Sequence, residues 1–194
     1  KGVQEVPMTP RRALFTAVLA ACILTTACSR PDTTPLPTTA SPPFVCDHVP
    51  LQAVERMTGL RNPPAKGSFE LAPADGDREG WCGVYRPDEE EVKVLDIELA
   101  TNNDPGRVES EVRDGAKRLP RILADADGYY SATRFGDHAG ALAVLIRGKS
   151  MLVVDMDRGA EGRDHEADVV ALMRLIAPRL LGDAVPSPTP GKGS

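Results

Sequence analysis

The fold is decided by the stretch ALAVLIRGKSMLVVDMD, residues 141–157. Apolar residues dominate two runs, Ala141–Arg147 and Met151–Asp157, and Gly148 and Lys149 lie between them. Two short apolar runs joined by a turn that contains glycine are typical of a β-hairpin. We therefore expect two antiparallel strands here.

Helices are predicted on both sides of this hairpin. After it, a helix from about Asp164 to Leu180 has a buried stripe at helical spacing, which consists of Val169, Leu172, Met173, Ile176 and Leu180. Before it, Asp104 and Pro105 stand in the order that is favoured at a helix start. The apolar face of this second helix is Val108, Val112, Ala116 and Leu119, and Pro120 ends or kinks it.

Further strands are predicted from alternation of apolar and polar residues. In Val92–Ala100, the apolar Leu95, Ile97 and Leu99 alternate with Asp96 and Glu98, so one face is wet. The other predicted strands are Trp81–Arg86, with Trp81 and Tyr85 on one face, Tyr129–Phe135, followed by a turn at Gly136–Gly140, and Ser68–Leu71.

A short helix is predicted near the start of this region, from Leu51 to Thr58. Asp47 or His48 could cap it, and Gly59 would stop it. The order of helix, strands, helix, strands and helix predicts an α+β fold: a mainly antiparallel sheet packed by two or three helices in one compact domain.

The N-terminal region has the pattern of a secretory signal peptide. Arg11 and Arg12 precede an uncharged apolar run from Ala13 to Ala27, which is too short to span a bilayer comfortably. Leu24–Cys28 is similar to a bacterial lipobox, which predicts a diacylglycerol on Cys28 and membrane anchoring by its acyl chains. Cys22 is the alternative lipid site.

Composition sets the predicted domain boundaries. Residues 1–27 comprise upstream residues and the signal peptide, and residues 28–43 form a disordered linker rich in proline and threonine. A single domain follows at residues 44–182, and residues 183–194 form a disordered tail. Removal of residues 1–27 leaves a net charge of −7, because three basic residues and one acidic residue are lost. This charge argues against nucleic acid as a partner and against a polybasic membrane patch.

Two cysteines remain inside the predicted domain, Cys46 and Cys82. In an exported domain an even pair predicts a disulfide, which would stabilise the fold by roughly 3.5–4 kcal/mol through loop closure. A metal site is disfavoured because the sequence has no Cys-x-x-Cys pair.

The sequence contains few candidates for chemistry. Each histidine has a carboxylate neighbour, but the acids near His48 and His165 also fit helix starts, and His138 falls in a turn. The segments that begin at Asp75 and Asp125 resemble only fragments of a calcium loop. The aromatic residues could line a groove, although core packing is the favoured interpretation; they are Trp81, Tyr85, Tyr129 and Tyr130.

A family resemblance extends over roughly Cys28 to Leu181. It rests on the lipobox, the Pro/Thr linker, Cys46 before a helix that ends at Met57-Thr58-Gly59, Trp81-Cys82, and Gly136-Asp137-x-Ala139. This arrangement resembles the actinobacterial lipoproteins grouped as domain of unknown function 3558. The resemblance implies a cell-envelope lipoprotein with a compact α+β domain and no established activity. It also supports Cys28 as the lipid site and Cys46–Cys82 as the bridge.

We therefore expect a non-enzymatic accessory, sensing or partner-binding module, lipid-anchored on the outer face of the cytoplasmic membrane. Its partner would be an envelope protein or a cell-wall component, and no cofactor or metal is expected. The alternative is a carrier of a lipid or small hydrophobic ligand, which needs an apolar cleft between sheet and helices. The third hypothesis is an envelope hydrolase, for which the sequence shows no nucleophile–base pair.

Overall fold

The structure is a computed structural model that describes residues 2, 33–72, 78–89, 92–102 and 104–182. The chain divides into two units, Lys1–Arg30 and Pro31–Ser194, and all elements below belong to the second. Several predictions lie outside the described residues: the signal peptide, the lipid sites Cys22 and Cys28, the first linker residues 28–32 and the tail 183–194.

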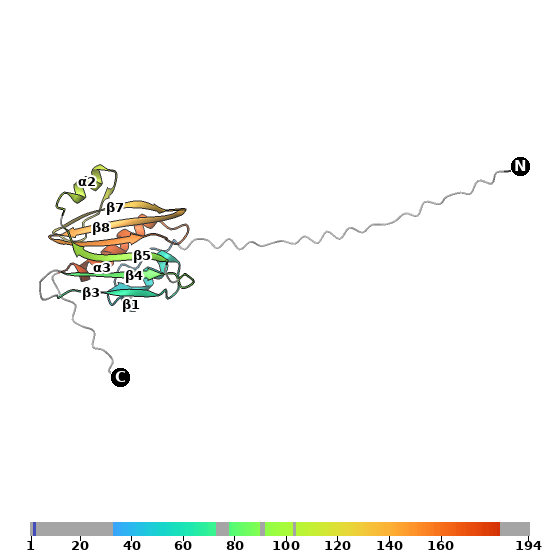
Figure 1. Cartoon of the computed structure of the whole chain (residues 1–194), viewed down its shortest axis with the longest axis horizontal. Coiled ribbons are helices and arrows are strands. Elements are labelled where there is room, and N and C mark those ends of the chain that lie inside the picture. The colour runs from blue at the N-terminus through green and yellow to red at the C-terminus, as the bar shows by residue number, and fades with distance from the viewer. Residues whose placement is uncertain (1, 3–32, 73–77, 90–91, 103, 183–194) are drawn as a thin grey trace, which may run out of the picture. The chain divides into compact units, whose positions relative to one another are not determined.

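A seven-stranded antiparallel sheet forms the centre of the described fold, with the order β3-β4-β5-β9-β8-β7-β6. Its strands are β3 (Ala65–Glu70), β4 (Glu79–Tyr85), β5 (Lys93–Thr101), β6 (Lys117–Arg118), β7 (Ala126–Phe135), β8 (His138–Arg147) and β9 (Ser150–Met156). Figure 1 shows β7 and β8 at one side of the sheet and β4 and β3 at the other. With three helices packed on it, the predicted α+β class is confirmed.

The predicted hairpin is confirmed as β8 and β9. Arg147 pairs with Ser150, and Gly148 in the turn between them has a φ of 59°. A positive φ at this place is the backbone conformation that glycine adopts without steric cost. Because β9 also pairs with β5, the hairpin joins the two halves of the sheet.

Helix α3 (His165–Leu180) covers one face of the sheet over β7, β8 and β9. The predicted stripe is confirmed, because all five of its residues are fully buried: Val169, Leu172, Met173, Ile176 and Leu180. The predicted start is confirmed too, since Asp164 caps the helix by accepting a hydrogen bond from the Ala167 N–H at 3.0 Å.

Helix α1 (Leu51–Thr58) has the predicted bounds and contributes Ala53, Val54 and Met57 to the same core. Gly59 ends it with a φ of 72°, as predicted. The prediction of a cap at Asp47 or His48 was wrong. The chain there forms a small hairpin of β1 (Phe44–Val45) and β2 (Val49–Pro50), so that Pro50 occupies the cap position.

Helix α2 (Arg107–Arg113) is shorter than predicted and packs on β7, on the face opposite α3. Asp104 does not cap it, but accepts a hydrogen bond from the Gly106 N–H at 2.9 Å. The helix ends before Gly115, whose φ is 111°, and the chain then pairs with β7 as β6. Strand pairing therefore replaces the last predicted helical turn.

The turn predicted at Gly136–Gly140 is tighter in the structure. Gly136 has a φ of 58°, and Phe135 pairs directly with His138, so β8 begins two residues before Gly140. The strand predicted at Ser68–Leu71 is present as β3, shifted toward the N-terminus. Both differences are at element ends, where local sequence signals are weakest.

The described part of the predicted linker packs against the domain. Leu36 is 6% exposed and belongs to the core cluster, and Ala40 packs against that cluster. Arg56 and Arg163 donate hydrogen bonds to the carbonyl oxygens of Pro35 and Thr34, at 2.6 and 3.1 Å. The ordered fold therefore reaches back beyond the predicted boundary at residue 44, because one apolar side chain and two arginines hold the segment in place.

A disulfide joins Cys46, in the turn between β1 and β2, to Cys82 in β4, with Cα atoms 5.8 Å apart. The predicted pairing is thus present in the structure. Cys82 is fully buried in the core, and its partner lies beside the start of α1. The bridge ties the N-terminal hairpin and α1 to the sheet.

We expect loss of this bridge to lower the free energy of unfolding by roughly 3.5–4 kcal/mol, because the unfolded chain regains loop entropy. The measurement is thermal unfolding of the protein and of a Cys46→Ser, Cys82→Ser double variant, each with and without reductant. Reductant should lower the melting temperature of the protein and leave that of the double variant unchanged. An unchanged melting temperature of the reduced protein contradicts the prediction.

Candidate functional site

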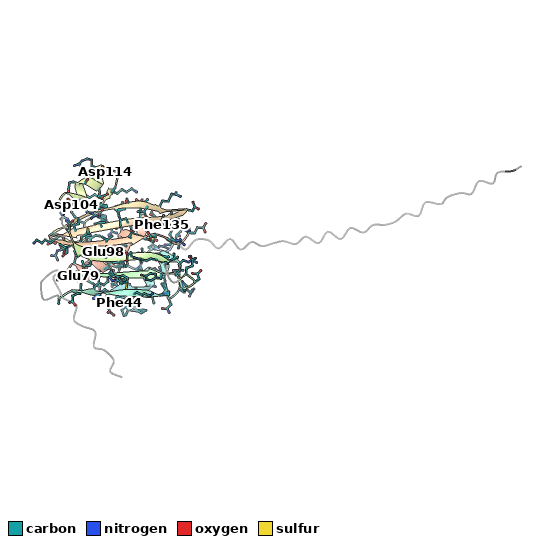
Figure 2. The ribbon with its side chains drawn as sticks, in the orientation of Figure 1. Phe44, Glu79, Glu98, Asp104, Asp114 and Phe135 are labelled. Atoms are coloured by element: carbon teal, nitrogen blue, oxygen red, sulfur yellow. A yellow bond between two sulfur atoms is a disulfide. The ribbon has the colours of Figure 1, made fainter. Side chains whose placement is uncertain are left out.

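An open groove of about 660 Å³ runs along β4 and β5, on the sheet face opposite α1 and α3. We call it the β4–β5 groove. Its aromatic and charged lining residues are Glu79, Trp81, Tyr85, Lys93, Asp96 and Glu98. In Figure 2, Glu79 and Glu98 lie near each other in this part of the sheet, and Phe135 lies apart from them.

Strand alternation explains why the groove carries these side chains. In β4, Cys82 and Val84 are fully buried in the core, so the residues next to them in the strand point to the other face. In β5, Leu95, Ile97 and Leu99 take the core positions, which leaves Asp96 and Glu98 outside. The predicted wet face of this strand is confirmed.

Trp81 is 44% exposed in the groove. The prediction that it packs in the core was therefore wrong, whereas the prediction that it shares a face with Tyr85 is confirmed. Cys82 is buried in the core, so its neighbour Trp81 in the strand points to the other face. Tyr129 fulfils the core prediction, because α2 and β8 bury it.

The absence of a side chain at Gly83 leaves room for the rings of Trp81 and Tyr85 to lie close to the β4 backbone. A Cβ atom at Gly83 would come within 2.9 Å of the Tyr85 hydroxyl and within 3.1 Å of the Trp81 ring. The first distance is shorter than real Cβ contacts and the second is unusually short, so a larger residue at this position would require the rings to shift. The Lys66 ammonium lies over the Tyr85 ring, 5.2 Å from the ring centre.

Two pairs of carboxylates lie in the rows before and after Trp81. Within each pair, the two residues are directly opposite each other on neighbouring strands. Glu70 is paired in register with Glu79, and Asp96 with Asp155. Carboxylates at such positions repel each other and destabilise a sheet. Lys93 offsets part of this repulsion through an ion pair with Asp96 at 2.7 Å.

The neighbouring carboxylates affect the pKa of Asp155. Burial raises the pKa of its carboxyl above the ordinary value, and the negative charges of Asp157 and Asp96 raise this pKa further. The folded protein therefore holds the proton on Asp155 more tightly than the unfolded chain does. Above the ordinary aspartate pKa, the ionised Asp155 makes the fold less stable, and this cost grows until the pH passes the raised pKa.

We expect Asp155→Asn to increase the free energy of unfolding at pH 7 by about 0.5 kcal/mol, because it removes one charge from a like-charged pair. The gain should shrink as the pH falls through the raised pKa of Asp155, where the native carboxyl becomes neutral. Urea unfolding of both proteins between about pH 3 and 7 measures this. Asp114→Asn, at an exposed position beyond α2, is the control. A destabilised Asp155→Asn variant at pH 7 contradicts the prediction.

The histidines lie in three separate places, and none of them lines the β4–β5 groove. His48 packs edge-on against Phe69, and burial together with the Arg179 charge lowers its pKa. His138 is exposed at the start of β8, and a ring nitrogen of His165 lies 3.0 Å from the Ala160 carbonyl oxygen. The adjacent Asp164 is used as a helix cap, as expected.

The calcium-loop fragments gain no support in the part of the chain that the structure describes. Asp75 and Asp77 of the first fragment lie outside it. In the second, Asp125 and Asp127 form ion pairs with Arg147 and Arg118, so both acids already have cationic partners. Within the described residues, no group of three or more His, Cys, Asp or Glu side chains is placed to hold a metal ion.

Comparisons with models of protein families, with curated proteins and with solved structures give no match. In the described ranges, the helices are all too short or too polar to cross a membrane. The site is therefore defined by its own geometry: an open, aromatic and acidic groove on a sheet whose other face is filled by α1 and α3.

Proposed function

We propose that this protein is a cell-envelope lipoprotein, anchored through Cys28 on the outer face of the cytoplasmic membrane, whose domain is a non-enzymatic partner-binding module. The lipobox and the resemblance to the domain of unknown function 3558 lipoproteins support the anchor. The observation that carries the binding role is Trp81, exposed on the wall of an open groove. Tryptophan is the residue type most enriched at binding hot spots, because it buries a large area on contact.

A binding role explains the groove better than a carrier role does. A carrier of a hydrophobic ligand needs an apolar cleft between the sheet and its helices. In this structure, the interface between the sheet and α3 contains a continuous cluster of buried side chains that includes Leu145, Leu152 and Met173. The β4–β5 groove lies on the other face, is open to solvent and has charged residues on its walls.

The anchor is tested by mass spectrometry of the mature protein extracted from its own membranes. We expect Cys28 to be the first residue and to carry a diacylglycerol and an amide-linked acyl chain. Cys28→Ser should abolish both the lipid mass and the membrane association, whereas Cys22→Ser should leave both unchanged. The opposite pattern assigns the lipid to Cys22, and an unlipidated mature protein refutes the anchor.

The binding role is tested by site-specific photo-crosslinking in intact cells. A photoreactive phenylalanine analogue replaces Trp81 in one variant and Phe135 in the other. Phe135 is the matched control, because it is also a large exposed aromatic residue, at 62% exposure, and lies outside the groove. We expect a defined crosslinked product from position 81 and none from position 135. Equal products from both positions, or none from position 81, contradict the proposal.

A further inference from the structure

The outer face around the β4–β5 groove has a regular arrangement of charge. Three rows of side chains lie on this face. The first joins β3 and β4 and is Glu70–Glu79; the other two cross β3, β4 and β5 and are Ser68–Trp81–Glu98 and Lys66–Gly83–Asp96. The third row continues to Asp155 in β9. Successive rows on one face of a sheet are about 7 Å apart, because a strand rises about 3.4 Å per residue. Trp81 thus lies between a row with two glutamates and a row that contains Asp96, Asp155 and one lysine.

The acids of this face outnumber its amines. Glu70, Glu79, Asp96, Glu98 and Asp155 occupy the three rows, and Lys66 and Lys93 are the amines beside them. Both amines already have contacts: Lys93 pairs with Asp96, and Lys66 lies over the ring of Tyr85. Glu79, two residues before Trp81 in β4, and Glu98, opposite Trp81 in β5, are both exposed, so a partner can reach all three.

We propose that the occupant of the β4–β5 groove is a basic segment of another protein, which stacks an arginine or lysine on Trp81 and pairs with Glu79 and Glu98. This inference rests on the proposed binding function and specifies the chemistry of the partner. A guanidinium group stacks on the indole face and also pairs with carboxylates, so one residue type satisfies both features. In an extended segment, alternate side chains are also about 7 Å apart, which matches the spacing of the rows.

Charge and shape distinguish this occupant from the alternatives. A second copy of the chain would bring the same acidic face, and an anionic membrane would be repelled by it. A single small cation would leave most of a groove of about 660 Å³ empty. A neutral glycan could stack on Trp81, but would leave the like-charged pair Glu70–Glu79 unrelieved.

Trp81 is the only tryptophan in the chain, so its fluorescence reports directly on the groove. The test titrates the full-length protein with a short peptide of alternating arginine and glycine. Peptides of the same length with glutamate or serine in place of arginine are the comparisons. We expect a saturable change in Trp81 emission with the arginine peptide alone, and weaker binding as the salt concentration rises.

Two double variants with the same change in net charge locate the interaction. Glu79→Gln with Glu98→Gln should weaken binding of the arginine peptide about fivefold, because two exposed ion pairs are lost. Asp114→Asn with Glu161→Gln should leave it within about twofold, because both residues are exposed outside the groove. Figure 2 shows Asp114 at α2, away from Glu79 and Glu98. Thermal unfolding of each variant verifies that it is folded.

Three results would overturn the inference: no saturable response to the arginine peptide, an equal response to the serine peptide, or equal weakening in both double variants. Crosslinking at position 81 separates this failure from failure of the proposed function. A product formed with an acidic or uncharged partner surface keeps the binding role and refutes the basic occupant. The absence of any product specific to position 81 refutes both.

Discussion

The packing of α3 on β8 and β9 is the interaction on which the rest of the structure depends. The inward residues of β8 include Ala141 and Ala143, which are small and fully buried, so the helix can approach the sheet closely. The helix presents its apolar stripe to these strands, and β9 carries the same core onward to β5. Burial of this kind is the dominant favourable contribution to folding.

This packing determines which side chains remain outside. Once α1 and α3 cover one face, every second residue of each strand is directed to the other face. Helix α2 covers that face over β7, where it buries Tyr129 together with Val108 and Val144. Over β4 and β5 the same face carries an open groove, and Trp81 and Glu98 are exposed there. The candidate site is therefore a direct consequence of a sheet that is covered unequally on its two faces.

The N-terminal approach to the domain is also fixed by specific contacts. Arg163 and Asp168 form a buried bidentate pair, with hydrogen bonds of 2.6 and 2.7 Å, and Arg163 also donates to the Thr34 carbonyl oxygen. Leu36 enters the core two residues later, and the disulfide holds the following hairpin on the sheet. If the chain is anchored upstream of residue 33, it joins the domain at a defined point. A force applied there would act on the contacts of Thr34 and Leu36 with the domain.

The sequence by itself determined the local elements whose signals are contained within a few neighbouring residues. The β8–β9 hairpin, the stripe and cap of α3, the glycine stop of α1 and the alternation in β5 were all predicted, because period and turn chemistry act over short distances. The pairing of Cys46 with Cys82 also followed, because they are the only two cysteines of the predicted domain.

Only the tertiary structure decided the features that depend on partners distant in the chain. The end of α2 depends on pairing between β6 and β7, and the burial of Leu36 depends on core residues far along the sequence. The exposure of Trp81 depends on which face of the sheet the helices cover. Composition led to the prediction that the segment around Leu36 is a linker and that Trp81 lies in the core. Both predictions failed, because composition holds no information on where a neighbouring element packs. Burial is a property of the assembled fold, and the sequence fixes it only through contacts that no short window contains.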